Sequence, residues 1–286
     1  MTIHRPVRVW QTSALGVASG ARHAPVEQRR LGQLKFMLKR LSRHALPAPL
    51  YDWLRRQWRG PESAPSVGAV GFGNLRRLTP VSQIFGAERG RCVDRYYIEN
   101  FLARHAADIR GRVLEVANNS YTTQYGGDRV VKSDVLYVEE GNPRATIVAD
   151  LTAADAISGE FFDCIILTQT LQFIYELRPA LATLHRALKP GGVLLITAPG
   201  ISQISRYDMD RWGDYWRFTS LSMKRLLGEV FSAPNIEVES HGNVLAAGAF
   251  LQGLASEELR REELDYRDAN YELLIAARAV KGAANS

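Results

Sequence analysis

The 286-residue chain has few cysteines, and it lacks both long apolar runs and clusters with metal-ligand spacing. Cys164 lies in an apolar run, which favours a buried thiol over a disulfide partner or a nucleophile, and Cys92 is the only other cysteine. No stretch reaches the roughly 18 uninterrupted apolar residues of a membrane span. The histidines are scattered, so we expect no structural metal. The first twenty residues lack the pattern of a secretory signal, which makes the cytoplasm the expected compartment.

The positive charge is confined to one end of the chain. Residues 1–60 carry 12 basic and 2 acidic residues, a net charge of +10, whereas the remainder carries 24 and 28, a net charge of −4. The overall hydrophobic content of 46% and charged content of 23% are typical of a globular protein and exclude collagen-like and disordered classes. The mildly acidic body argues against a nucleic-acid partner.

The basic end predicts a helix over residues 25–43, where leucines recur at helical spacing. Two interpretations are open. The segment 25–60 can attach weakly to the anionic inner face of a membrane, helped by Trp53 and Trp58. Alternatively, its leucines pack on the body of the protein or on a partner protein. We therefore divide the chain into a basic, partly helical extension (1–60), a linker and helical lead-in (61–110) and a domain over 111–286.

The domain over 111–286 alternates strands and helices. A helix over 93–109 precedes it, and Gly111 is a candidate C-cap. Strands are predicted at 112–116, 130–135, 145–150, 162–167, 193–197, 236–240 and 271–280, with helices at 176–188 and 220–231. Nearly continuous Val/Ile/Leu strands separated by helices indicate a doubly wound, mainly parallel seven-stranded α/β sheet. The last two strands fit a hairpin-like addition at one edge.

Polar groups fall at the strand ends, where ligands bind in an open parallel sheet. Glu115, Asp134, Asp150 and Gln169 occupy such positions. Asp134 follows Glu115 by 19 residues, close to the spacing of a carboxylate that binds a ribose diol. The alternative is that Asp134 and Asp150 cap turns or pair with arginines.

The chain resembles the class I S-adenosylmethionine-dependent methyltransferases, in particular the methyltransferase type 11 group. The segment that carries this resemblance consists of strand 162–167, the helix that follows it, the Leu188–Gly192 turn and the next strand. The resemblance covers roughly residues 111–280. The Trp-Gly-Asp-Tyr-Trp-Arg-Phe-Thr segment at 212–219 is similar to a bacterial subset that accompanies sugar-modifying enzymes of polysaccharide biosynthesis. The resemblance implies a Rossmann-like fold, S-adenosylmethionine as cofactor, and a small-molecule or glycan acceptor.

The resemblance also implies roles for individual residues. Glu115 would be the acidic residue of the first cofactor motif, Asp134 the ribose ligand, Asp150 the adenine-side residue and Gln169 a neighbour of the methionine portion. The complete cofactor set is Glu115, Ala117, Asn118, Asp134, Asp150, Leu151 and Gln169. The family's Gly-x-Gly turn is replaced by Ala117-Asn118-Asn119, and Asn tolerates left-handed backbone better than other non-glycine residues.

Methylation of a hydroxyl, by in-line transfer, benefits from a general base. The candidates lie in loops on the acceptor side: Asp208, Asp210, Asp214 and His241. An aromatic wall with a cation for the substrate is predicted from Trp212, Tyr215, Trp216 and Arg217. The alternative is a packed loop in which Arg217 ties Asp214 to the core.

Two other functions compete with an active methyltransferase. The altered first loop and the short connections after the first two strands also fit a non-catalytic binding or scaffold module that has lost the cofactor. A nicotinamide-dependent oxidoreductase would require Gly-x-Gly-x-x-Gly after the first strand, and the chain has no such motif.

Overall fold

The computed structural model describes residues 65–153, 157 and 159–283. Among them, residues 72–153, 157 and 159–283 belong to one unit of the chain. The predicted helix over 25–43 lies outside the described residues, as do Trp53 and Trp58, so the prediction for this segment stays a prediction. Within the described ranges, no helix has the length and apolar character needed to cross a bilayer.

The unit is built on a seven-stranded sheet with the order β3-β2-β1-β4-β5-β7-β6. The strands are β1 (Gly111–Val116), β2 (Val130–Tyr137), β3 (Ile147–Val148), β4 (Phe162–Thr168), β5 (Leu188–Pro199), β6 (Ile236–His241) and β7 (Leu274–Val280). β1 to β5 are parallel, and β7 runs antiparallel to both of its neighbours. This confirms the predicted doubly wound, mainly parallel sheet with its antiparallel pair at one edge. In that pair, β6 is the edge strand and β7 lies between β5 and β6.

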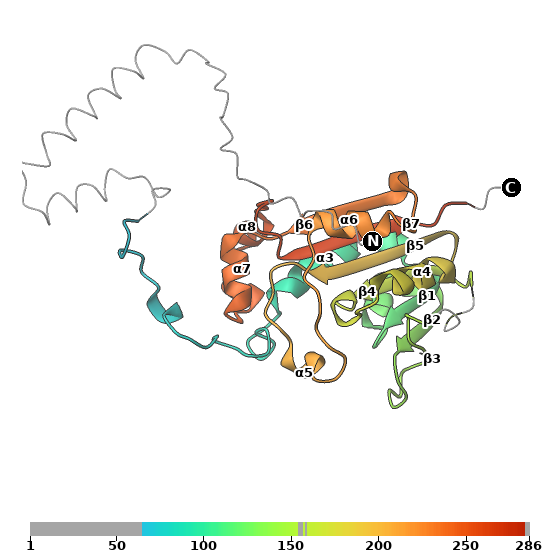
Figure 1. Ribbon diagram of the computed structural model, residues 1–286, viewed down its shortest axis with the longest axis horizontal. Coiled ribbons are helices and arrows are strands. Elements are labelled where there is room, and N and C mark those ends of the chain that lie inside the picture. The colour runs from blue at the N-terminus through green and yellow to red at the C-terminus, as the bar shows by residue number, and fades with distance from the viewer. Residues whose placement is uncertain (1–64, 154–156, 158, 284–286) are drawn as a thin grey trace, which may run out of the picture. The chain divides into compact units, whose positions relative to one another are not determined.

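Helices cover both faces of the sheet (Figure 1). They are α3 (Val93–Arg104), α4 (Leu177–Ala187), α6 (Ser220–Leu227), α7 (Val244–Leu251) and α8 (Arg261–Asp265). A further short helix, α5 (Arg206–Met209), follows β5 and has no buried residue. Buried residues of α4 and α6 share one apolar core with the sheet, and those of α3, α7 and α8 share the other. The sheet is therefore buried from both sides, as its continuous apolar strands require.

The turn from α4 into β5 follows from its sequence. Pro190 disfavours helical geometry at the preceding residue, and α4 ends at Ala187. Gly191 has φ 76°, the value that the second central position of a type II turn requires. Pairing resumes earlier than we predicted, because Leu188 already pairs with Phe162. The turn therefore sits as an irregularity within β5.

The helix predicted over 93–109 is shorter in the structure. α3 ends at Arg104, and a single 3-10 turn, η2 (Ala106–Asp108), follows it. Gly111 does have positive φ, at 66°, but it is the first residue of β1 and not a C-cap. A Cβ at Gly111 would lie 2.4 Å from Oδ2 of Asp163, which accepts a hydrogen bond from the Arg112 amide. Close approach to this carboxylate explains the glycine.

The connections after β1 and β2 are short, as predicted. A π-helical turn, η3 (Thr122–Gly126), and a 3-10 turn, η4 (Gly127–Arg129), replace a covering helix between β1 and β2. Residues 138–146 connect β2 to β3 without a helix, and β3 itself has only two residues instead of the predicted six. Loops therefore border the carboxyl ends of β1, β2 and β3.

Candidate active site

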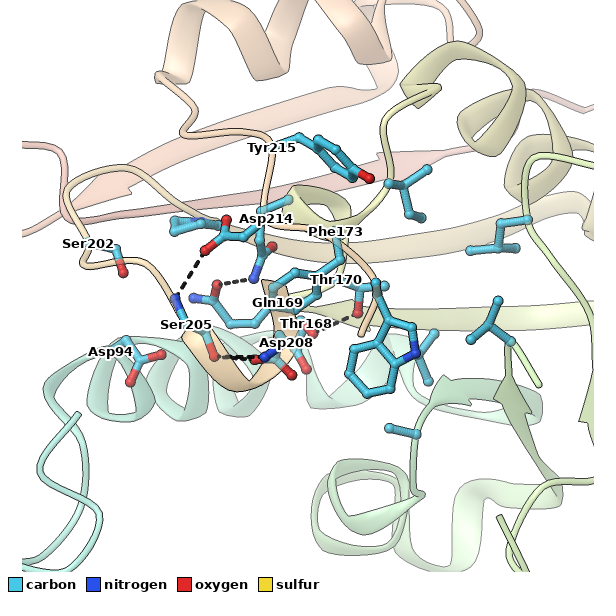
Figure 2. Close-up of a pocket in the computed structure, with 18 of the residues that line it drawn as sticks. Asp94, Thr168, Gln169, Thr170, Phe173, Ser202, Ser205, Asp208, Asp214 and Tyr215 are labelled. Atoms are coloured by element: carbon cyan, nitrogen blue, oxygen red, sulfur yellow. Dashed lines mark hydrogen bonds between the residues drawn. The ribbon is translucent and has the colours of Figure 1, made fainter. Parts of the chain in front are cut away.

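A cleft of about 1080 Å³ opens at the carboxyl ends of the parallel strands. Val116, Thr168 and Pro199, at the ends of β1, β4 and β5, line it, and Figure 2 shows part of its wall. This is the position expected for a ligand in an open α/β sheet. Pockets that bury drug-sized ligands measure about 300–1,000 Å³, so the cleft has room for such a molecule.

Glu115 holds the loop that follows β1. Its buried carboxylate accepts hydrogen bonds from the Thr122 amide and hydroxyl, each at 2.7 Å, and from the Tyr121 amide at 3.2 Å. Burial raises the pKa of Glu115, and these hydrogen bonds oppose the shift. Glu115 lines the cleft as predicted, and its carboxylate fixes the start of η3 against the end of β1.

The turn after β1 survives without glycine, but its left-handed residue is not an asparagine. Ala117 has φ 70°, and neither Asn118 nor Asn119 has positive φ. The Ala117 carbonyl accepts a hydrogen bond from Asn142 Nδ2 at 2.8 Å, which braces this strained turn. Asn118 folds its side chain back, with Oδ1 accepting from the Ser120 amide at 2.9 Å. Ala117 and Asn118 line the cleft and leave it open.

The structure corrects our prediction for Asp134. This residue lies within β2, is only 2% exposed and does not line the cleft. Its Oδ2 is 2.6 Å from Arg112 Nε, and Oδ1 accepts a hydrogen bond from Thr146 Oγ1 at 3.1 Å. The alternative of an arginine partner is therefore confirmed. β2 continues two residues further than predicted toward its carboxyl end, so Tyr137 and Val138 line the cleft instead.

The remaining predicted cofactor residues do meet in the cleft. Asp150 and Leu151 follow β3, and Gln169 follows β4. Asp150 is exposed, and its Oδ1 accepts hydrogen bonds from the Thr152 amide and hydroxyl, each at 2.8 Å, so it also caps a turn. Gln169 has φ 47°, and its amide donates to the Thr197 carbonyl at 2.9 Å.

The opposite wall comes from the segment after β5. Its Ser205 hydroxyl donates to Asp208 Oδ2 at 2.6 Å, and its amide donates to Asp214 Oδ2 at 3.1 Å (Figure 2). Asp214 also pairs with Arg217, at 2.5 Å between Oδ1 and Nη1. Arg217 thus pairs with Asp214, as in the packed-loop alternative, and both residues also line the cleft. Asp208 is the predicted general-base candidate in the cleft whose carboxylate has no ion-pair partner among the described residues.

Three predicted residues lie away from the cleft lining. Asp210 points outward in an exposed ion pair with Arg206. His241 stacks on Tyr97, with 5.4 Å between ring centroids. Trp216 donates from Nε1 to the Ile174 carbonyl at 3.1 Å and packs against the core beside α4 and α6. These positions correct their assignment to catalysis or substrate binding. Trp212 and Tyr215 are the predicted aromatic residues that line the cleft.

Sequence reasoning missed one end of the cleft. Asp94 and Arg95, in the first turn of α3, line it together with Tyr121. Phe85 also lines it and packs on Phe250, with 5.8 Å between ring centroids. We had assigned α3 to a lead-in before the domain. The adjacent opposite charges of Asp94 and Arg95, at the start of a predicted helix, were the one signal in the sequence that could have indicated this end of the cleft.

The prediction of a buried thiol at Cys164 is confirmed. Cys164 is 0% exposed in the middle of β4, and burial raises its pKa. Among the residues that the structure describes, no three His, Cys, Asp or Glu side chains gather in a group that could hold a metal ion.

Comparison with known proteins finds similarity over part of the chain. Residues 99–196 match the methyltransferase domain family. No curated protein matches the chain. An S-adenosylmethionine-dependent methyltransferase from Archaeoglobus fulgidus is 13% identical, with a TM-score of 0.44 over 65% of this chain and 94% of that one. The N-methyltransferase NodS from Bradyrhizobium japonicum is 16% identical, with a TM-score of 0.42 over 66% and 97%.

A third solved structure is phosphoethanolamine N-methyltransferase 2 from Haemonchus contortus in complex with S-adenosylmethionine. It is 16% identical, with a TM-score of 0.43 over 74% of this chain and 55% of that one. These identities are too low to assign an acceptor. The match to the methyltransferase domain family covers residues 99–196, from α3 to within β5.

Proposed function

We propose that the protein transfers a methyl group from S-adenosylmethionine to a hydroxyl of a small-molecule or glycan acceptor. The observation that carries this proposal is the cleft itself. Glu115, Ala117, Asp150 and Gln169 face it from the ends of β1, β3 and β4, and Asp208 faces it from the segment after β5. One space is thus bordered by groups for a nucleoside donor and by a carboxylate for an acceptor.

The residues present fit the donor. Leu151 and Val138 are apolar residues that line the same cleft as the carboxylate of Asp150, a combination that suits an adenine and its polar edge. Because Asp134 is committed to Arg112, we assign the ribose to the end of β2, where Tyr137 offers a hydroxyl. Gln169 and the turn at Ala117 border the place left for the amino-acid portion.

The charge of the cleft also suits a cationic donor. Six acidic residues line it, whereas two arginines do so: Asp94, Glu115, Asp150, Glu176, Asp208 and Asp214 against Arg95 and Arg217. A cleft lined mainly by one sign of charge raises the local concentration of ligands of opposite sign. The sulfonium of S-adenosylmethionine carries such a positive charge.

When bound, S-adenosylmethionine supplies a methyl group that its sulfonium already activates. The protein then has to align the acceptor oxygen with that methyl group and remove the hydroxyl proton. We assign the proton to Asp208, whose carboxylate lines the cleft and is positioned by the Ser205 hydroxyl at 2.6 Å. Ser205 is in turn held through its amide by Asp214.

The acceptor assignment rests on the aromatic groups of the same wall. Trp212 and Tyr215 line the cleft, and Tyr215 lies at 5.3 Å from Tyr175 between ring centroids. Aromatic faces offer broad apolar contact together with a polar edge, which suits the apolar face and the hydroxyls of a sugar ring. A glycan or nucleotide-sugar acceptor, as in polysaccharide biosynthesis, is the substrate class that we propose.

Two measurements test the proposed function. Calorimetric titration with S-adenosylhomocysteine should show saturable binding at micromolar ligand. Labelled S-adenosylmethionine, incubated with glycan precursors of the native cell, should then label a fraction that boiled enzyme leaves unlabelled. Binding without transfer to any hydroxyl acceptor would contradict the O-methylation proposal. The absence of binding heat at high micromolar ligand would favour the non-catalytic module.

We also retain a proposal for the basic segment 25–60. Its charge and the two tryptophans Trp53 and Trp58 favour weak peripheral attachment to the inner face of the cytoplasmic membrane. Flotation with anionic liposomes compares the full chain with a chain that lacks residues 1–60. Equal recovery of the two proteins with the lipid would remove the proposal.

A further inference from the structure

The start of α3 brings two opposite charges to the cleft that the proposed methyl transfer does not use. Asp94 is 8% exposed and lines the cleft, and its Oδ1 has no hydrogen-bond partner among the described residues. Arg95 follows it and lines the cleft as well. The hydrogen bond of the Arg95 guanidinium runs from Nη1 to Tyr121 Oη at 3.1 Å.

A buried carboxylate oxygen without a partner is costly. Burial raises the pKa of Asp94, and the nearby charge of Arg95 only partly offsets this shift. Buried polar atoms in folded proteins are nearly always hydrogen-bonded, so an exception in a cleft points to a missing ligand. A cationic donor would supply a hydrogen bond to Oδ1, together with a further positive charge beside the carboxylate.

The position of the pair selects one part of the methyl donor. Arg95 bonds Tyr121, and the Tyr121 amide donates to Glu115 Oε1 at 3.2 Å, so the pair lies beside the loop after β1. Figure 2 shows Asp94 on α3, directed toward the space bounded by Ser202 and Ser205. Successive residues of an α-helix are rotated by about 100°, so Asp94 and Arg95 face two different groups rather than one.

We propose that Asp94 binds the ammonium group and Arg95 the carboxylate group of the donor's amino-acid portion. The proposal rests on the proposed function, because it assumes S-adenosylmethionine as the donor. A zwitterion matches the pair in charge, since the ammonium satisfies the buried carboxylate. The guanidinium has five N–H donors, and its bond to Tyr121 leaves others for a carboxylate.

The test compares two ligands that differ in this portion alone. S-adenosylhomocysteine keeps the amino acid, whereas 5′-methylthioadenosine keeps the nucleoside and the thioether but lacks the amino acid. Both are titrated calorimetrically into the wild type, Asp94→Asn, Arg95→Gln and the control Asp210→Asn, whose site is exposed and outside the cleft. We expect each cleft variant to lose about 10- to 100-fold in affinity for S-adenosylhomocysteine, the size of a lost charged hydrogen bond. Affinity for methylthioadenosine should change less than about twofold in the same variants.

A ligand-side measurement keeps the test valid if a variant is misfolded. Decarboxylated S-adenosylhomocysteine should bind the wild type about 10- to 100-fold more weakly than the intact ligand. Arg95→Gln should then add little to that loss, because the two changes remove the same contact. Equal loss of both nucleosides in Asp94→Asn and Arg95→Gln, together with full affinity of the wild type for the decarboxylated ligand, would overturn the proposal.

Other results separate the inference from the proposed function. If Asp94→Asn binds S-adenosylhomocysteine normally but transfers methyl groups slowly, Asp94 serves the acceptor and the inference is wrong while the methyltransferase stands. If the wild type binds methylthioadenosine and S-adenosylhomocysteine equally well, the inference is again wrong, although a nucleoside site exists. If the wild type binds neither ligand, the proposed function fails and the inference with it.

Discussion

The two halves of the sheet are built differently. Around β4, β5 and β7, the crossovers are helices, and residues such as Leu184 and Leu194 are 0% exposed. Around β2 and β3, the connections are turns, and Val131 and Val148 are 87% and 49% exposed. The first half is therefore covered by helices and deeply buried. The second half is bordered by loops, and most of the residues that we propose for the methyl donor lie there.

The largest effect that we predict concerns the segment after β5, residues 200–219, which we call the acceptor wall. This segment continues from the well-packed half of the sheet. Asp208→Asn should lower the rate of methyl transfer about 10²- to 10⁴-fold, because the amide cannot take the hydroxyl proton. The affinity for S-adenosylhomocysteine, measured by calorimetry, should stay unchanged. Asp210→Asn, in the exposed pair with Arg206, is the matched control and should retain full activity. A rate within about threefold of the wild type for Asp208→Asn would exclude general-base catalysis by this residue.

Stability should depend strongly on the well-packed half. Leu184→Ala, on the buried face of α4, should lower the free energy of unfolding by about 2–5 kcal/mol. Val148→Ala, on the half-exposed strand β3, should cost less than about 1 kcal/mol because little apolar area is lost. Urea unfolding followed by circular dichroism measures both. Similar losses in the two variants would mean that the two halves are equally important for the fold.

Binding of the methyl donor should weaken when the loop that follows β1 loses its hydrogen bonds to Glu115. Glu115→Gln replaces a carboxylate that holds Thr122 and Tyr121 by an amide with one acceptor oxygen. We expect the affinity for S-adenosylhomocysteine to fall about 10-fold or more, since a hydrogen bond to a charged group contributes roughly 1.5–3 kcal/mol. Thr122→Val, which removes the hydroxyl but keeps the amide, should lose less affinity. Unchanged binding in Glu115→Gln would show that the loop is held by other contacts.

Acid should weaken one ion pair of the well-packed half. Asp108 bonds Arg278 at 2.8 and 3.1 Å. Burial alone would raise the pKa of Asp108, but hydrogen bonds from His105 and Arg278 hold it well below the ordinary value of 3.8. The contribution of the Asp108–Arg278 ion pair to the free energy of unfolding is therefore fully present above about pH 4. It is lost as the pH falls toward the pKa of Asp108 in the folded protein.

Asp108→Asn should cost about 1–3 kcal/mol at neutral pH, measured as the free energy of urea unfolding. The difference from the wild type should shrink as the pH is lowered below 4. Glu237→Gln removes an exposed partner of the same arginine and should cost less than about 1 kcal/mol at any pH. A loss for Asp108→Asn that does not change with pH would point to packing rather than charge.

The same contrast explains what could be predicted from the sequence. The strands and the turn at Gly191 are local patterns of apolar runs, proline and glycine, so the order of the strands and this turn are confirmed, whereas the bounds of β2, β3 and β5 differ from the prediction. Asp134 was misplaced because strand ends were judged from sequence spacing, and β2 runs two residues further than its apolar pattern indicates. Its partner Arg112 lies on the neighbouring strand, so the pairing depends on register.

The acceptor wall and α3 were harder to predict for a different reason. Trp216 and Trp212 are four residues apart, yet one packs on the core and the other lines the cleft. No periodicity distinguishes them, because the segment is neither a regular helix nor a strand. Asp94 reaches the cleft only because α3 packs on the sheet beside α7, which is a tertiary contact.

The smallest effect concerns the strained turn of the loosely packed half. Ala117 has φ 70°, a conformation that costs an L-residue roughly 1–2 kcal/mol and glycine almost nothing. Ala117→Gly relieves this strain but increases the entropy of the unfolded chain, so the net gain in unfolding free energy should be at most about 1 kcal/mol. Removing a methyl group at the cleft should also raise the affinity for S-adenosylhomocysteine. Ala103→Gly, at an exposed position in α3, should instead cost about 0.5–1 kcal/mol, so opposite signs in urea unfolding are the expected result. If Ala117→Gly destabilised the protein as much as Ala103→Gly, the turn would be held by its contacts with Asn142 and Leu136 rather than strained against them.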